Sequence, residues 1–198
     1  MSRHTAARMA YTVFLLAMLL GVLGSVLTVL NGRFPPPWAG IILAFLGFLA
    51  VGVLITSRRP ENLIGWLFCI IGLASVWEFF AQEYAFYALV TEPGALPAGA
   101  WLAWSTFLAD SIAWVLMFFA LLLFPNGRLT SPRWRPLAWG AAATFAVEGL
   151  LTAIEPRRLP GVPAPNPTGI ERAAGIIESS TNVVIVVFLV SCWRSPPR

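Results

Sequence analysis

The side chains best able to do chemistry in this sequence are acids inside long apolar runs. Three successive runs hold Glu78 and Glu83, then Asp110, then Glu148. Hydroxyl, amide or small residues, Gln82 among them, recur beside these acids at three- or four-residue spacing, so each run would form a helix with a narrow polar face. A charged residue at the centre of a bilayer costs about 2.5–3.5 kcal/mol, and we therefore expect none of the acids to face lipid.

The depths of the acids can be compared by counting residues. Glu78 and Asp110 are nearly equidistant from the turn-forming residues 94–95, which predicts that they lie at similar depth on antiparallel helices. No Arg or Lys is expected in this zone, so the acids would be protonated, linked through water or neutralised by a bound cation. Three roles remain open: hydrogen bonding between helices, a cavity for an organic cation among aromatic side chains, or a proton path.

Catalysis finds little support in the inventory of side chains. The single His is His4, Lys is absent, and no metalloprotease, serine hydrolase, P-loop or dinucleotide-binding motif occurs. An aspartyl-type dyad is the only hydrolytic chemistry left, and Asp110 is the only Asp in the chain. We therefore predict that the chain is not an enzyme and holds neither a cofactor nor a metal.

The composition is that of a membrane protein. Hydrophobic residues make up 58% and charged residues 11%, with a mean hydropathy of +0.77, whereas about 25% charge is usual in globular domains. An ordinary soluble protein and a disordered chain are both excluded. We predict an all-α polytopic helical bundle forming one membrane domain over 1–198, with five to six spans at 9–30, 38–56, 63–90, 100–124, 136–154 and 173–193, and an outer Pro-rich loop at 155–172.

Arginines set the expected topology. All thirteen basic residues are Arg, and six spans place more of them on the cytoplasmic side than five spans would. This predicts a multipass protein of the bacterial cytoplasmic membrane with both termini in the cytoplasm. The net charge of +4 is then explained by topology and contact with the lipid bilayer rather than by nucleic acid. The predicted anchors at the cytoplasmic interface are Arg58, Arg59, Arg128, Arg133 and Arg135.

Two segments indicate a relationship to known proteins more specifically than the apolar runs do. One is RRPENLIGWL at 58–67, and the other is FPNGRLTSPRWRP at 124–136, with the LPAGAW loop at 96–101 between them. In this order they resemble the N-terminal multispan region of sensor histidine kinases from actinobacteria and Chloroflexi, over roughly residues 50–145. The resemblance implies a non-catalytic sensor or input module of a two-component system.

That module would signal by helix rearrangement to a partner signalling protein, a second copy or an output domain. The chain has neither the phospho-acceptor His nor the ATP-binding glycine motif of such kinases, so the resemblance implies a detached or truncated module. The alternative is a small transporter of protons or organic cations that uses Glu78, Asp110 and Glu148.

Overall fold

The computed structural model describes residues 2–33, 39–124, 127–129, 131–156, 158–159 and 161–170, with side chains except at 39–42, 133 and 137. Its α-helices are α1 (Arg3–Leu30), α2 (Ala39–Arg58), α3 (Leu63–Phe86), α4 (Gly99–Leu123) and α5 (Arg135–Ile154). A π-helical turn, η1 (Tyr87–Thr91), extends α3, and a 3-10 turn, η2 (Pro132–Trp134), precedes α5. The described residues contain no strand, which confirms the all-α prediction.

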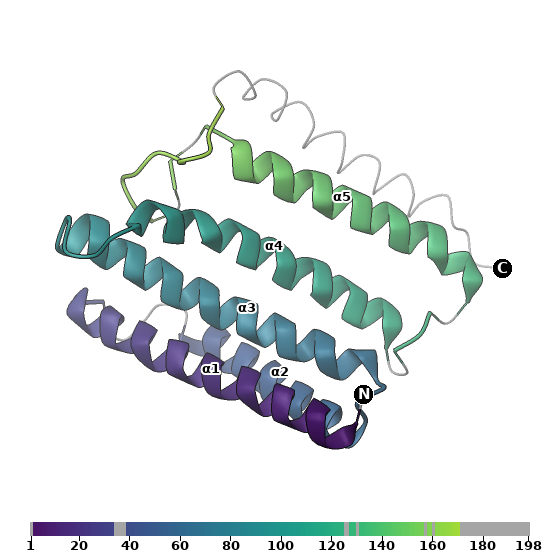
Figure 1. Ribbon diagram of the computed structural model, residues 1–198. Helices are drawn as coiled ribbons and strands as arrows, with labels where there is room; N and C mark the ends of the chain where they lie inside the picture. The colour runs from purple at the N-terminus through teal and green to yellow at the C-terminus, as the bar shows by residue number, and fades with distance from the viewer. Residues whose placement is uncertain are drawn as a thin grey trace.

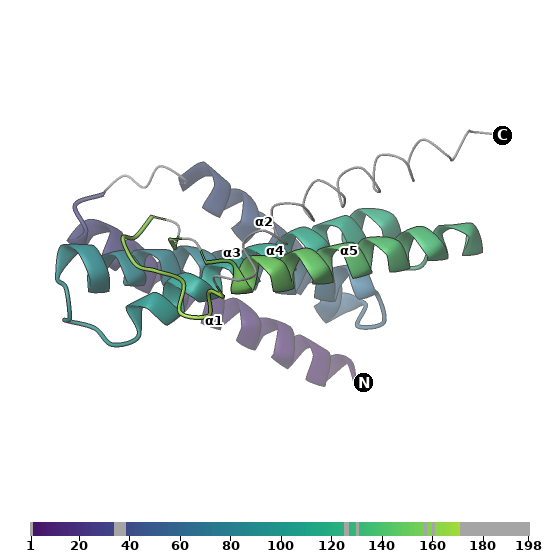
Figure 2. The same cartoon turned by 90° about the horizontal axis from the view of Figure 1, so that it is seen from above.

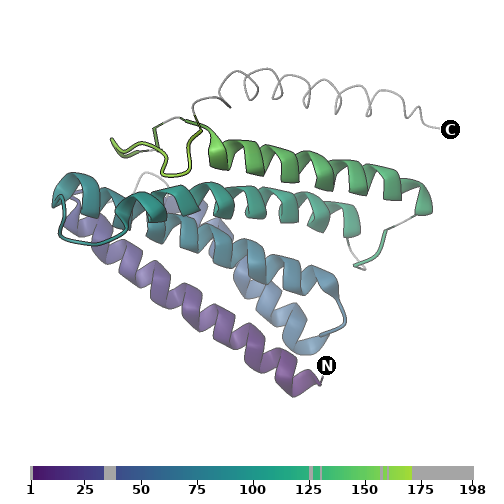
Figure 3. The same ribbon diagram turned by 45° about the horizontal axis from the view of Figure 1, so that its top comes forward.

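Helix α3 is the centre of the bundle. It packs against α1, α2 and α4, whereas α5 packs against α4. Figure 1 shows α3, α4 and α5 following one another in a row, so that α3 and α4 form one antiparallel hairpin and α4 and α5 another. Figure 3 shows these two hairpins from another side. Seen from above, α1 and α2 diverge to opposite sides of that row (Figure 2). A displacement of α3 would therefore change its packing against three neighbouring helices.

The bundle has two distinct ends. The end that we call the basic end holds the start of α1, the 58–63 turn and the 124–134 connection, with Arg58, Arg59, Arg128 and Arg135 exposed on it. The other, which we call the opposite end, holds the end of α1, the 92–98 turn and the segment 155–170. These positions follow from helices that run the length of the bundle in alternating directions from α3 onward.

Three of the described helical segments are long and apolar enough to cross a membrane: Arg3–Leu30, Leu63–Thr91 and Gly99–Leu123. Two shorter apolar stretches, Leu43–Arg58 and Ala138–Ile154, accompany them. Large apolar side chains cover the outward faces, with Leu15 67% and Leu121 73% exposed. Such a surface suits lipid rather than water. The predicted sixth span, 173–193, lies outside the described residues.

Local sequence signals explain most helix ends. The Asn62 side chain accepts a hydrogen bond from the Ile64 amide at 3.0 Å and so caps α3. Pro136 lies in the first turn of α5, where its fixed φ suits the helix and its missing N–H is not needed. Gly127 adopts the left-handed conformation after α4, with φ +70°. Helix α1 begins earlier than its apolar run, at Arg3, because Ser2 accepts from the Thr5 amide at 3.2 Å.

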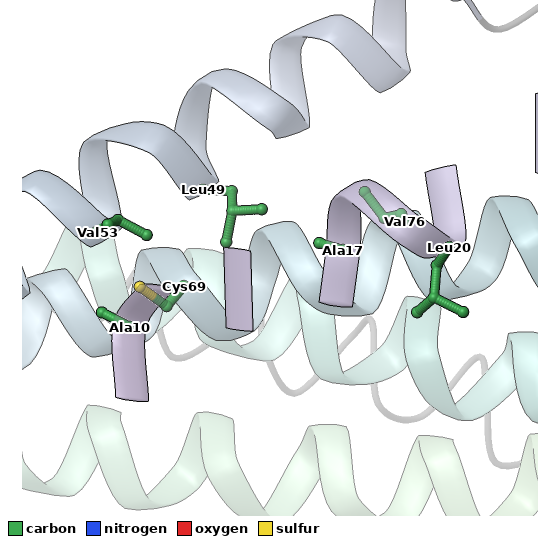
Figure 4. Packing of buried hydrophobic residues seen from close by; sticks show 7 residues of the cluster. All are labelled: Ala10, Ala17, Leu20, Leu49, Val53, Cys69 and Val76. Carbon is green, nitrogen blue, oxygen red and sulfur yellow. The ribbon is translucent and has the colours of Figure 1, made fainter. Parts of the chain in front are cut away.

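Close approach of α2 and α3 depends on glycine. A Cβ on Gly52 would lie 2.6 Å from the Cys69 amide nitrogen, and one on Gly72 would lie 3.0 Å from the Leu49 Cα. Because these are backbone atoms, no side-chain movement could make room. Figure 4 shows the resulting cluster, in which α2 and α3 contribute to one core with α1; it comprises Ala10, Ala17, Leu20, Leu49, Val53, Cys69 and Val76.

Candidate functional site

The acids predicted as one intramembrane cluster fall into separate environments. Glu78 and Asp110 lie on the packed helices α3 and α4, within the range at which their charges interact. Glu83 is fully buried against the end of α1. Glu148 is exposed on α5 in the described part of the chain. The structure therefore brings together Glu78 and Asp110, which we call the acid pair, and separates the other two acids from it.

The acid pair lies near the middle of both helices, which confirms the prediction of similar depth. Glu78 is partly buried, and Asp110 is exposed with the Trp114 side chain as a hydrogen-bonding partner. One turn before Glu78, the Ser75 hydroxyl is buried without a hydrogen-bond partner among the described residues. Two carboxyl groups whose charges interact titrate as a coupled pair and can together attract a cation.

The exposure of Asp110 differs from the expectation that no acid would face outward, and so does that of Glu148. The three- and four-residue spacing correctly predicts a face on α4, since Ala103, Thr106 and Ala113 are buried. Asp110 follows Thr106 at four-residue spacing on the same face but is exposed. Its carboxyl group is thus accessible from outside the described bundle.

A second polar group closes the opposite end. It consists of Asn31, Arg33, Glu83, Phe86 and Thr91, which we call the Glu83 cluster. The Asn31 amide donates to Glu83 Oε2 at 2.9 Å and to the Glu83 carbonyl at 3.0 Å, and the Thr91 hydroxyl donates to Asn31 Oδ1 at 2.6 Å. Arg33 Nη1 lies 3.5 Å from Glu83 Oε1, with its guanidinium 4.5 Å from the Phe86 ring centre.

The expectation that no Arg shares the zone of the acids is therefore wrong for Glu83. Arg33 follows the end of α1, and α1 and α3 run in the same direction, so both reach the opposite end together. The long Arg side chain then extends back to the buried carboxylate. Counting residues along these two parallel helices would not have found this contact, because Arg33 lies beyond the end of α1 whereas Glu83 lies within α3.

The Pro-rich segment after α5 packs onto the bundle up to the last described residue, 170. Leu159, Val162 and Ala164 are buried against Ala85 of α3 and Ala103 of α4. Gly161 lies directly against the Gln82 amide, which places this predicted polar residue under the segment. The segment is anchored at α5, where Asn166 donates to the Ala153 carbonyl at 2.9 Å. It forms a cover over α3 and α4 at the opposite end.

At the basic end, the two segments singled out in the sequence meet. A Cβ on Gly127 would lie 3.1 Å from Asn62 Oδ1 and 3.1 Å from the Leu63 amide, so the second segment is seated on the cap of α3. The first is folded on itself by a hydrogen bond from Trp66 Nε1 to the Pro60 carbonyl at 3.1 Å. Four of the predicted anchors, Arg58, Arg59, Arg128 and Arg135, are exposed, and the Arg133 side chain lies outside the described residues.

Within the described ranges, no group of three or more His, Cys, Asp or Glu side chains could hold a metal ion. Comparison of the chain with protein-family models, with curated proteins and with solved structures finds no match. The features of the described residues that could carry a function are the acid pair, the Glu83 cluster and the contact at the basic end.

Proposed function

We propose that this chain is a non-catalytic membrane input module of the sensor type, which passes a conformational change to a partner signalling protein or an output domain. The proposal includes six spans in the bacterial cytoplasmic membrane, with the basic end in the cytoplasm as the positive-inside rule requires. The observation that carries it is the contact between Gly127 and the Asn62 cap, because it joins the two segments on which the resemblance to sensor kinases depends.

The arrangement of α3 supports transmission along the bundle. This helix takes part in the Glu83 cluster at one end, in the acid pair at its middle and in the Asn62–Gly127 contact at the other end. Packed helices shift as rigid bodies between discrete arrangements rather than deforming continuously. A change in protonation or ligation at the acid pair would therefore displace α4 relative to α3. This displacement would alter the contact between Gly127 and the Asn62 cap.

Complementation in the source bacterium tests signalling. The gene would be deleted, the transcriptome recorded, and the strain complemented with the wild type, Gly127→Ala or Gly140→Ala. Gly140 is the matched control, since a Cβ there meets no atom within 4 Å. We expect the wild type and Gly140→Ala to restore the transcript pattern, and Gly127→Ala to accumulate in the membrane without restoring it. An unchanged transcriptome after deletion, or full rescue by Gly127→Ala, would contradict the proposal.

A second candidate function is transport of protons or an organic cation. The exposed Asp110 carboxyl beside Glu78 favours it, because translocated cations require an acid that is accessible within the membrane. The test is flux into proteoliposomes containing the purified chain and a pH-sensitive dye. Flux that is lost in Asp110→Asn and kept in the exposed control Glu61→Gln would establish transport and displace the sensor proposal.

A further inference from the structure

A groove runs between α4 and α5 toward the basic end. Its wider part has a volume of about 560 Å³ and is lined by Phe119, Leu129, Arg135, Ala138, Trp139 and Ala142. A narrower part of about 330 Å³ continues along the two helices between side chains such as Val115 and Phe145. Ala142 lines both parts, so they adjoin. Each volume falls within the range of about 300–1,000 Å³ that is usual for small-molecule sites.

Small residues on α5 create this groove. Ala142, Ala146 and Gly149 follow one another at four- and three-residue spacing, which places them on one face toward α4. They oppose bulky side chains of α4, including Leu108 and Leu116. The narrower part is almost wholly apolar, with Ser111 as its only polar side chain among the lining residues. This part therefore suits an apolar occupant, such as a hydrocarbon chain, rather than a polar solute.

The wider part of the groove, unlike the narrower part, carries positive charge. Arg135 lines it, and Arg128 is exposed on the connection that leads to it. No acidic residue occurs between Asp110 and Glu148 in the sequence, so no carboxylate of this hairpin opposes these arginines at the basic end. Trp139, one turn after Arg135 and 76% exposed, also lines this part. Arginine and tryptophan together are typical of the level of lipid headgroups.

We propose that this groove binds one anionic diacyl phospholipid. One acyl chain lies along α4 and α5 in the narrower part, and the phosphate is held by the Arg135 guanidinium, which can donate two parallel hydrogen bonds to it. Trp139 lies beside the glycerol region. The order of chemistry along the groove, from apolar to cationic, matches a phospholipid and gives preference to a negative headgroup. The site does not depend on the proposed function, since none of its lining residues belongs to the acid pair.

Native mass spectrometry of the full chain tests the site. The protein would be released from micelles containing equal amounts of phosphatidylglycerol and phosphatidylcholine with identical acyl chains. We expect one phosphatidylglycerol to be retained in preference. Arg135→Gln should lower its occupancy about fivefold, as expected for one basic residue near a membrane surface. Ala146→Phe, which fills the narrower part, should lower it as well.

Matched controls separate the groove from general effects. Arg58→Gln removes an exposed arginine elsewhere on the basic end, and Ala143→Phe enlarges an exposed residue of α5 outside the groove. Both should retain the lipid as the wild type does. Because Arg135 is exposed, its replacement keeps the test decisive even if Ala146→Phe does not fold.

Four results would overturn the proposal. Equal retention of the two lipids would show no headgroup preference, and equal loss in the two controls would show binding outside the groove. A lipid-free dimer that Ala146→Phe dissociates would identify a second copy as the occupant. A disulfide between Ala146→Cys and the native Cys192, which lies outside the described residues, would identify the chain's own C-terminal segment.

Discussion

Arg33 and Glu83 form an ion pair whose two halves are unequally buried, and removing each half should have a different effect. The Glu83 side chain is fully buried, whereas 25% of the Arg33 side chain is exposed. Arg33→Gln therefore leaves a buried carboxylate without its cation. Glu83→Gln leaves a cation that can still contact water and the Phe86 ring. We predict that Arg33→Gln destabilises the fold more than Glu83→Gln does.

The magnitudes depend on the contacts that remain. Breaking a buried ion pair costs about 3–5 kcal/mol, and we expect about 3 kcal/mol for Arg33→Gln because the Asn31 amide still donates to Glu83 Oε2. Glu83→Gln should cost about 1 kcal/mol, since a side-chain amide oxygen can accept the same hydrogen bond. The double variant leaves no buried charge and should cost about 2 kcal/mol. The two substitutions are then coupled by about 2 kcal/mol.

The assay is reversible unfolding of the purified chain in mixed micelles by increasing sodium dodecyl sulfate, followed by tryptophan fluorescence and far-UV circular dichroism. Arg8→Gln, an exposed arginine near the start of α1, serves as the control and should unfold as the wild type does. Additive effects of the two substitutions, or a larger loss for Glu83→Gln than for Arg33→Gln, would refute the assignment of the ion pair.

Three further predictions concern helix packing and topology. Gly52→Ala should destabilise the chain by about 2 kcal/mol or more, because the added Cβ would meet the Cys69 backbone. Gly47→Ala on the same helix is the control and should be neutral or stabilising, since no atom lies within 4 Å of a Cβ added there. Thermal unfolding in detergent compares the two variants. Asn62→Ala should lower the free energy of unfolding by about 1 kcal/mol through loss of the α3 cap, measured in the same micelles. On intact cells, an impermeant thiol reagent should label Gly94→Cys and not Arg128→Cys, and the reverse pattern would invert the proposed topology.

Much of the helical framework was predictable because each apolar run between turn residues is long enough for one helix. The starts of α3 and α5 and the left-handed Gly127 follow from local chemistry that acts within one turn of the chain. The approach of Glu78 and Asp110 was also predictable, since antiparallel helices joined by a short turn must pass each other at equal depth. These features depend only on neighbours in the sequence.

The features that sequence reasoning missed depend on which helix packs against which. One face of α3 carries Glu78 toward α4, and another carries Glu83 toward α1, but an apolar run with acids at several positions does not reveal the identity of either neighbour. Arg33 was excluded from the buried zone because its position after an apolar run suggests exposure to solvent. Its side chain nonetheless reaches Glu83 because α1 and α3 end together.

The π-helical turn η1 has a consequence for the lengths that homologous chains can tolerate. Its wide turn, in which the Glu92 amide donates to the Tyr87 carbonyl at 2.9 Å, places Thr91 where it donates to Asn31. Deleting one residue from 87–91 would convert the turn to a regular α-helix and rotate the 92–98 turn about the α3 axis by about 100°. Thr91 would then face away from Asn31, and α4 would enter the bundle from another direction. A single codon lost here should therefore disturb the packing of α4, far from the altered residue.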